Sequence, residues 1–496
     1  MTRFTTAILL LTACGCIWIA GSRHDQLVEM RDTYHLNQAE ALENTPPLVA
    51  FTTVALGGFR GLLVDLLWVR LSRLQTEGKY FELVQLSDWI TKLEPRSAAI
   101  WTFQAWNLSY NISVLMSNYE DRWRWVRHGV TLLRDEGLFY NRGSAKLYKE
   151  LGWLFQHKIG SDSDQAHWLY KREWYKDMDS VLNGPRPDYA AMHAIPTTHK
   201  KLMKFDDVKK LVEDIRSAQI EPFDLRWISN DARTAKMNEI LARHQEGGDK
   251  LIIFLRKSAL INTYKLDLEK MEALEQKYGH LDWRIPETQS LYWAVCGLPY
   301  AKTAFERQSL NRMIFQSLIA LFQRGRFIIE DGELANLPDL DIYPYVEEAF
   351  KDAFKSGTRI TTFDEAYKNF LVDAMMLNFY YKRDAESRAI FARIKELDIP
   401  EIKGQTYESI IAFMSNAPID ELQRHRVLSM IDGLLIRAYG EQLMGKDDVA
   451  KRYESIARHS WNEFMDMRRQ TNCRARTGLP SFETLRKIAK MQQQQG

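Results

Sequence analysis

The sequence predicts an all-α protein in which helical hairpins repeat and stack as an α-solenoid. An N-terminal transmembrane helix precedes the array and a less regular helical region follows it. Three observations predict this class. The 496 residues include 14 Trp, 21 Tyr and 23 Phe to bury but only 14 Pro and 25 Gly, few for an all-β protein with many turns. A pattern of large and small residues recurs after residue 62, and an apolar run lies within residues 1–22.

The bulk composition narrows the classes of function. The chain is too long for one compact core, so two or more domains or an extended array are expected. With 67 basic and 65 acidic residues the net charge is +2, which offers no overall field for nucleic acid, and we expect no nucleic-acid partner. The four cysteines form neither a disulfide framework nor a CxxC metal pair; they are Cys14, Cys16, Cys296 and Cys473.

Residues 1–22 are interpreted as a membrane anchor. The apolar run from Phe4 to Ala20 is at the short end of the range of about 17 to 25 residues for a spanning helix. Two alternatives stay open, because "LTAC" has the form of a lipobox that would lipidate Cys14, and "IAGS" offers a partial signal-cleavage site. An N-terminal span most often exports the domain behind it. We therefore expect a single-pass anchor and a large domain on the periplasmic or other extracytoplasmic side.

Residues 23–61 are interpreted as a juxtamembrane linker and entry segment. Their end runs into "ALGGFRGLLVDLLW", which is apolar enough to suggest a second span and has a GxxxG spacing at Gly57 and Gly61. Arg60 and Asp65 are costly in lipid but ordinary at the start of a soluble helix. The repeat phase favours the soluble helix, and a re-entrant or interfacial segment at residues 47–59 stays as the alternative.

Residues 62–184 hold the repeats. In "EGKYFELVQLSDWITKLEP" the residues Gly78, Tyr80 and Pro95 have the spacing of the second helix of a hairpin, which sets the first repeat position at Val64. A period of 34 residues, typical of one repeat architecture, then predicts a new repeat at Ala98. From there the chain reads "AAIWTFQAW", which puts large Trp101 and small Ala105 at the expected positions.

A third first-helix reads "AKLYKELGWLFQHKIG" from Ala145, with pattern residues Tyr148, Leu151, Gly152 and Phe155. Its start is later than the period requires, so we expect an insertion near "VLMSNYED". A weaker fourth match is "WAVCGLPY", in which Pro299 should end the helix early. In such arrays small residues let helices approach, and no hairpin buries its apolar face alone.

These motifs resemble the tetratricopeptide (TPR) repeat family. The amino-acid sequence from "LGGFRGLLVDLLW" to "YKELGWLFQHKIGSDSDQAH" also resembles that of uncharacterised membrane-anchored bacterial proteins with TPR-like repeats. The resemblance implies stacked helix pairs and a protein-binding role. It implies no biochemical reaction.

The remainder divides by composition. "NGPRPDYAAMHAIP" is a Pro-containing break, and residues 185–285 read as this linker followed by a charged helical region. Residues 286–467 are interpreted as a C-terminal helical domain with degenerate repeat-like pieces. Residues 468–496 form a basic tail that ends in "QQQQG" and is expected to fray.

No catalytic pattern is present. The chain contains no HExxH, GxSxG, GxxxxGK[ST], GxGxxG or EF-hand sequence, so we expect no catalytic residues, no cofactor and no metal. His157 and His167 flank "KIGSDSDQA", which is interpreted as a solvated turn. Cys296 stands in repeat register and is interpreted as a buried core thiol.

Two clusters interleave aromatic and basic residues, "DRWRWVRHG" and "HWLYKREWYK". One interpretation is that the aromatic stripe packs into the core while the basic residues are solvated. The other is a surface that contacts a protein or peptide. Its candidate partner-binding residues are Arg122, Arg124, Arg127, Lys171 and Arg172.

The leading hypothesis for function is a membrane-anchored helical-repeat protein that acts as a protein–protein interaction scaffold in the bacterial cell envelope. One alternative is an envelope enzyme, a hydrolase or glycan-modifying protein, with its site after residue 185. A pocket there with a buried carboxylate pair or a histidine of shifted pKa would favour it. Another alternative is a structural subunit of a larger membrane complex.

Overall fold

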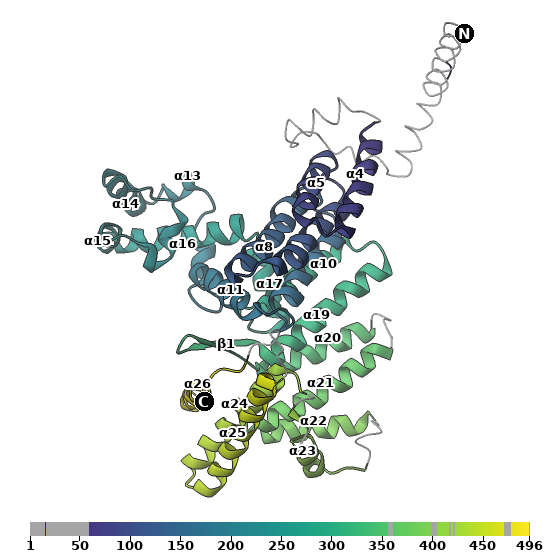
Figure 1. Cartoon of the computed structure of the whole chain (residues 1–496). Coiled ribbons are helices and arrows are strands. Elements are labelled where there is room, and N and C mark those ends of the chain that lie inside the picture. Colours follow the sequence, from purple (N-terminus) through teal and green to yellow (C-terminus); the bar gives the residue numbers. More distant parts are fainter. Residues whose placement is uncertain are drawn as a thin grey trace.

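The computed structural model describes residue 15 and residues 59–355, 361–397, 404–415, 418–419, 422–470 and 478–495. The predictions for the anchor, for lipidation at Cys14, for residues 47–58 and for Cys473 lie outside the described residues. Within these ranges the chain is mostly helical, which agrees with the all-α class (Figure 1). None of the helices described is both long enough and apolar enough to cross a membrane.

The first hairpin pairs α4 (Phe59–Thr76) with α5 (Tyr80–Leu93). The turn between them contains Gly78 at φ +71°, a conformation that glycine adopts without a steric penalty. α5 ends just before Pro95, as the pattern predicts. The Pro95 carbonyl accepts hydrogen bonds from Trp101 Nε1 at 2.7 Å and from Asn141 Nδ2 at 2.8 Å, so this turn is tied to the second hairpin.

The second hairpin begins at Ala98, where the repeat is expected to restart. Its two arms are continuous helices that alternate α- and π-helical turns: α6 (Ala98–Trp106), a π-helical segment (Asn107–Ile112) and α7 (Ser113–Leu115), then α8 (Tyr119–Thr131), a π-helical segment (Leu132–Gly137) and α9 (Leu138–Tyr140). Only residues 116–118 separate the arms, so the prediction of an insertion near "VLMSNYED" is wrong. The extra residues lengthen both helices, and π-helical turns accommodate them.

Small residues bring the arms of this hairpin together. A Cβ added at Gly129 of α8 would lie 2.1 Å from Ser109 Oγ and 3.0 Å from the carbonyl oxygen of Ala105. These distances are too short for any larger side chain without movement. The pair Ala105 and Gly129 therefore sets the closest approach of the two helices.

The third hairpin begins at Ala145, again as expected, and Ser144 caps it by accepting a hydrogen bond from the amide of Leu147. Its arms are α10 (Ala145–Trp153) with a π-helical segment (Leu154–Ile159), and α11 (His167–Leu182). α18 (Pro286–Gly297), which holds the fourth match, packs directly on α10 although more than a hundred residues separate them along the chain.

Glycines make this contact possible. A Cβ at Gly152 of α10 would lie 3.3 Å from the carbonyl oxygen of Ser290, and one at Gly297 would lie 2.8 Å from Tyr148 Cβ. α18 ends at Gly297, and a 3₁₀ turn (Leu298–Tyr300) containing Pro299 follows, as the early stop predicts. Tyr300 stacks on Tyr148 with ring centroids 5.5 Å apart.

The intervening residues 183–285 form a lobe beside the stack, from which α13 to α16 project (Figure 1). Its helices are α12 (Tyr189–Ala194), α13 (His199–Leu202), α14 (Asp206–Ser217), α15 (Ala235–Arg243), α16 (Gln245–Ser258) and α17 (Leu268–Tyr278). The Pro-containing break is packed into this lobe, since Lys257 Nζ donates to the carbonyls of Met192 at 2.8 Å and Ile195 at 2.7 Å.

A β-hairpin follows α19 (Ala304–Arg324) and was not expected from the sequence. β1 (Arg326–Glu330) pairs antiparallel with β2 (Glu333–Leu337). Asp331 and Gly332 both have positive φ, the signature of a tight type I′ turn. The "DG" between two short apolar stretches is the signal that could have predicted it.

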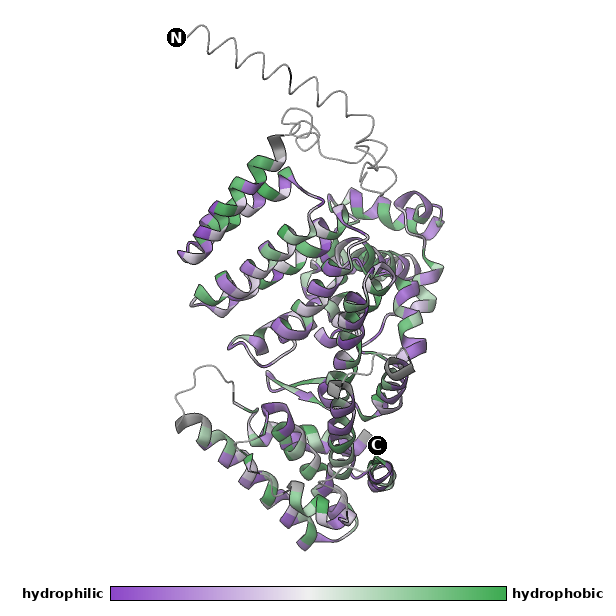
Figure 2. Cartoon of the chain, turned by 90° about the vertical axis from the view of Figure 1, so that its right-hand side faces the viewer, coloured by the Kyte–Doolittle hydropathy of each residue, from purple (hydrophilic) through white to green (hydrophobic). Residues whose placement is uncertain are grey.

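The C-terminal part is helical and packs around α24 at the end of the molecule opposite α4 (Figure 1). Its helices are α20 (Tyr343–Lys355), α21 (Thr361–Tyr380), α22 (Asp384–Glu396), α23 (Tyr407–Ser415), α24 (Arg424–Leu443), α25 (Asp447–Gln470) and α26 (Phe482–Gln495). Most of the helices in the fold carry both apolar and polar residues along their length (Figure 2), as helices half buried against neighbours do.

The C-terminal tail is docked, so the expectation that it frays is wrong for α26. Leu485, Ile488 and Ala489 of α26 are fully buried. Gln492 donates to Asp432 of α24 and accepts from Arg326 of β1 at 2.7 Å. The apolar spacing of "FETLRKIAKM" is therefore that of a helix with a buried face.

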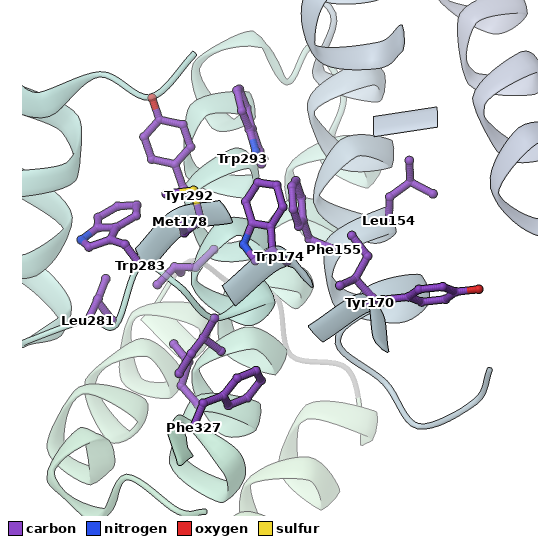
Figure 3. Packing of buried hydrophobic residues seen from close by; sticks show 14 of the residues in the cluster. Leu154, Phe155, Tyr170, Trp174, Met178, Leu281, Trp283, Tyr292, Trp293 and Phe327 are labelled. Atoms are coloured by element: carbon purple, nitrogen blue, oxygen red, sulfur yellow. The ribbon is translucent and has the colours of Figure 1, made fainter. Parts of the chain in front are cut away.

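Large aromatic side chains fill the core where the third hairpin meets α18 (Figure 3). Trp174 of α11 meets Phe155 edge to face at 4.7 Å, and Tyr292 meets Trp293 in the same way at 5.0 Å. Phe327 of β1 extends this cluster toward the C-terminal part. One continuous core thus joins the hairpin stack to the segments that follow it.

Candidate functional site

The five basic candidates do not form one surface. They lie on α8 and α11, where Lys171 is buried and Arg122 is largely covered. Arg122 donates from Nε to the carbonyl of Met116 at 2.7 Å and has a side chain that is only 13% exposed. The side chain of Lys171 is 1% exposed. Neither side chain faces solvent, so we no longer count either among the groups that could contact a partner.

The other three basic candidates lie at the surface, each beside an acidic side chain. Arg124 is 2.7 Å from Asp121. Arg127 is 3.4 Å from Asp177. Arg172 stacks over the Trp168 ring and is 3.1 Å from Glu173. Exposed pairs of this kind neutralise each other and contribute little to stability, so these residues do not make a strong basic patch.

Lys171 belongs to a buried ionic cluster formed by the "SDSDQAH" loop. Its Nζ is 2.5 Å from Asp162 Oδ1 and 3.0 Å from His167 Nδ1. Burial opposes the charge on Asp162, but Lys171 and His167 outweigh it and hold the pKa of Asp162 well below its usual value. Burial, assisted by Lys171, lowers the pKa of His167 to about 4, so this imidazole is neutral at pH 7. The interpretation of the loop as a solvated turn is wrong.

The cluster continues into the C-terminal helices. Arg424 of α24 approaches Asp162 at 3.9 Å, and Arg324 of α19 pairs with Glu287 of α18 at 2.8 Å. These charges connect the loop before α11 with three later helices. Buried pairs hold a specific arrangement while adding little net stability, so we interpret the cluster as a structural tie between the hairpin stack and the C-terminal part. Across the described ranges, no group of three or more His, Cys, Asp or Glu side chains is placed to hold a metal ion.

Cys296 is half buried on α18, as expected of a core thiol. Burial raises the pKa of its thiol to about 11. The thiolate is the nucleophilic form, and it is scarce at neutral pH with such a pKa. Cys296 is therefore a packing residue.

An aromatic ladder crosses the first arms of the second and third hairpins, a feature that the sequence analysis missed. Trp106 stacks on Tyr110 at 5.1 Å, Tyr110 meets His157 at 5.8 Å, and His157 stacks on Trp153 at 4.7 Å with an interplanar angle of 9°. Tyr110 Oη and His157 Nδ1 are 3.1 Å apart and hydrogen-bonded. Burial lowers the pKa of His157, which keeps the ladder uncharged at neutral pH.

A groove adjoins the ladder between α10 and α19. Trp153 lines it from the α10 side, and Phe305 and Arg312 line it from α19. Phe305 is 76% exposed, unusually high for a large apolar side chain. Arg312 has no ion-pair partner within the described part of the chain, whereas Lys149 on the opposite wall pairs with Glu150 at 3.1 Å. The groove thus offers apolar surface beside one uncompensated positive charge.

A signal for the ladder exists in the sequence. Tyr110 and His157 are 47 residues apart, the same separation as Trp106 and Trp153 and as the hairpin starts Ala98 and Ala145. Aromatic residues at equivalent repeat positions on two stacked helices must lie near each other. The basic clusters drew attention to the second arms of the hairpins, whereas the ladder lies on the first arms.

Comparison of the chain with protein families, with curated proteins and with solved structures finds no match. The functional interpretation therefore rests on the residues and their geometry.

Proposed function

We propose that this protein is a membrane-anchored helical-repeat scaffold, of the TPR-like kind, that binds a partner protein in the bacterial cell envelope. The observation that carries the proposal is the aromatic ladder with its adjoining groove. Three helices from different hairpins contribute to this surface, namely α6 with its π-helical extension, α10 and α19. Aromatic residues and arginine dominate the contacts that hold protein partners together.

The stacking of the hairpins supports the repeat part of the proposal. α6 and α10 begin at the repeat positions that the pattern requires, and the small residues Ala105 and Gly152 lie at helix contacts. Such an array exposes a long surface formed by successive helices, which suits extended partners. The apolar run at the N-terminus supports the membrane anchor and the extracytoplasmic placement of the large domain.

The groove suggests the chemistry of the bound segment. Phe305 and Trp153 offer apolar contact area, and Arg312 offers a charge for a carboxylate. We propose a partner segment that inserts an apolar side chain beside Phe305 and carries an acidic residue near it. No cofactor and no metal enter this function.

Photo-crosslinking from the groove tests the proposal. A photoreactive amino acid in place of Phe305 is expected to give one dominant crosslinked protein in intact cells. The matched control is the same substitution at Phe413 of α23, which is equally exposed at 76% but lies on another helix. Phe305→Ala and Arg312→Ala should leave the thermal transition unchanged and abolish co-purification of the crosslinked protein. Identical crosslinks from both positions, or a partner retained by both alanine variants, would contradict the proposal.

The envelope-enzyme alternative has partial support from a pocket after residue 185 that contains Asp373 and His425. Asp373 Oδ2 already accepts hydrogen bonds from Gln323 and Arg426, both at 2.8 Å. Burial lowers the pKa of His425 to about 3, so its imidazole stays neutral. Asp373 is already engaged as an acceptor, and His425 does not take up a proton. Both features favour binding over acid–base chemistry.

A further inference from the structure

The pocket between α21 and α24 has a defined length. The two helices run parallel, and their contacts include the Asp373–Arg426 ion pair at 2.8 Å and Gly433 against Tyr380. A Cβ at Gly433 would lie 2.7 Å from Tyr380 Cβ, so the helices touch there. Seven residues separate these contacts on each helix, which corresponds to about 10 Å of helix. The pocket lies along this stretch of the two helices and extends past the ion pair to Leu422.

The body of the pocket is apolar. Met376, Leu377 and Tyr380 line it from α21, and Leu422 and Met430 line it from the α24 side. Its cavity volume is about 70 Å³, and it opens to solvent on one side. Methionine side chains adapt to ligands of different shape. An elongated apolar molecule fits this lining better than a polar one.

Polar groups lie at the ion-pair end. Asp373 accepts both of its hydrogen bonds on Oδ2, and its Oδ1 has no hydrogen-bond partner among the described residues. His425 also lines the pocket and is only 7% exposed. Its Nε2 has no hydrogen-bond partner among the described residues. Buried polar atoms are nearly always paired in native proteins, so the buried, unpaired Nε2 of His425 indicates a missing ligand group. Asp373 Oδ1 is a second free acceptor in the lining of the same pocket.

The charges at this end select the head group. Asp373 is compensated by Arg426, so the pocket offers no net charge to a ligand. Burial raises the pKa of Asp373 because a charge is poorly solvated there, and an anionic ligand would add a second poorly solvated charge. A hydroxyl group can donate to a carboxylate oxygen and accept from an imidazole N–H at the same time.

We propose that this pocket is a binding site for an uncharged aliphatic alcohol. Its chain lies between Met376 and Met430, and its hydroxyl group donates to Asp373 Oδ1 and accepts from His425 Nε2. The site is separate from the aromatic ladder and does not depend on the scaffold function.

Photoaffinity labelling of the full chain in membranes tests the site directly. The probe is an eight-carbon alcohol that carries a diazirine, and mass spectrometry locates the labelled residues. Labels are expected on Met376, Leu377 or Met430, and excess 1-octanol should reduce them at least tenfold. Octanoate and octylamine at equal concentration should not. Met430→Trp fills the pocket and should remove these labels, whereas the control Met444→Trp, at the exposed end of the same helix, should retain them.

Three results would overturn the proposal. One is labelling spread over the exposed helices with none in the pocket. Another is pocket labelling that Met430→Trp leaves unchanged, since the alcohol would then not occupy this space. The third is equal competition by octanoate, because a pocket that accepts an anion does not select a hydroxyl head group.

Discussion

At the scale of single residues, the surroundings decide what a charged side chain does. Arg124 and Lys171 both stand in clusters where aromatic and basic residues interleave, yet Arg124 is 78% exposed and Lys171 is 1% exposed. Helical periodicity turns Arg124 outward, while the loop that contains Asp162 folds over Lys171 and supplies its counter-charge. A buried ammonium is tolerated only when such a partner is present.

Asp432 of α24 gives a prediction about pH. Burial raises its pKa to about 6, from 3.8 in an unfolded chain, although Tyr381 and Gln492 donate hydrogen bonds to it. The folded protein therefore takes up this proton before the unfolded chain does. The contribution of Asp432 to stability is lowest above pH 6 and rises as the pH falls from about 6 to 4.

Asp432→Asn removes this titration. We expect the free energy of unfolding of the wild type, relative to the variant, to increase by roughly 1 to 3 kcal/mol between pH 7.5 and pH 4.5. His167 and His425 have lowered pKa values and act in the opposite direction, but both proteins share them, so they cancel in the difference. Denaturant unfolding at several pH values measures it. A difference that does not change with pH would refute the assignment.

At the scale of elements, glycines control how closely helices approach. Gly433→Ala should destabilise the protein by about 1 to 3 kcal/mol, because overpacking a helix contact forces backbone shifts. The new Cβ would meet the backbone of Tyr380 at 3.0 Å, and that backbone cannot move aside easily.

The matched control is Gly61→Ala on α4, where nothing lies within 4 Å of the added Cβ. That variant should be about 0.5 to 1 kcal/mol more stable, because alanine is the better helix former. Thermal or denaturant unfolding compares the two variants. Equal effects of the two substitutions would show that helix propensity, and not the contact with α21, governs position 433.

At the scale of the whole molecule, the fourth repeat-like helix returns to the stack after a long excursion. α18 packs on α10 as the next first arm would in an uninterrupted array, and residues 183–285 form a lobe between them in sequence. The approach of Arg424 of α24 to Asp162 then joins the stack to the C-terminal helices. We propose that this assembly lies on the extracytoplasmic side of the membrane, because an N-terminal span most often exports the domain behind it.

Protease treatment of intact spheroplasts tests that side. With the large domain outside the cytoplasmic membrane, added protease should degrade the chain to fragments, and a cytoplasmic marker protein should survive. Cleavage should begin in exposed loops of the lobe formed by residues 183–285, since loops are the preferred sites of nicking. Protection of the full-length chain until the membrane is lysed would overturn the extracytoplasmic placement.

Two of the three predicted repeat starts coincide with helix starts, because periodic apolar spacing and repeat phase are local properties, whereas α4 begins at Phe59 and not at the predicted Val64. Ala98 and Ala145 begin helices as predicted, and Pro299 ends α18 within a turn. The Asp-Gly turn of the β-hairpin was equally local but was overlooked among helical signals. The predicted insertion was misplaced because longer helices and an inserted loop add the same number of residues to a repeat, so the sequence spacing does not distinguish them.

Helix content, the order of the hairpins and the buried thiol at Cys296 thus follow from the sequence by itself. Tertiary structure alone decided which charges are buried, that α18 joins α10 and that α26 docks. The physical reason is the separation along the chain of the residues that determine each feature. Periodicity fixes which side chains share a face of one helix, whereas burial and pairing depend on which distant helix covers that face.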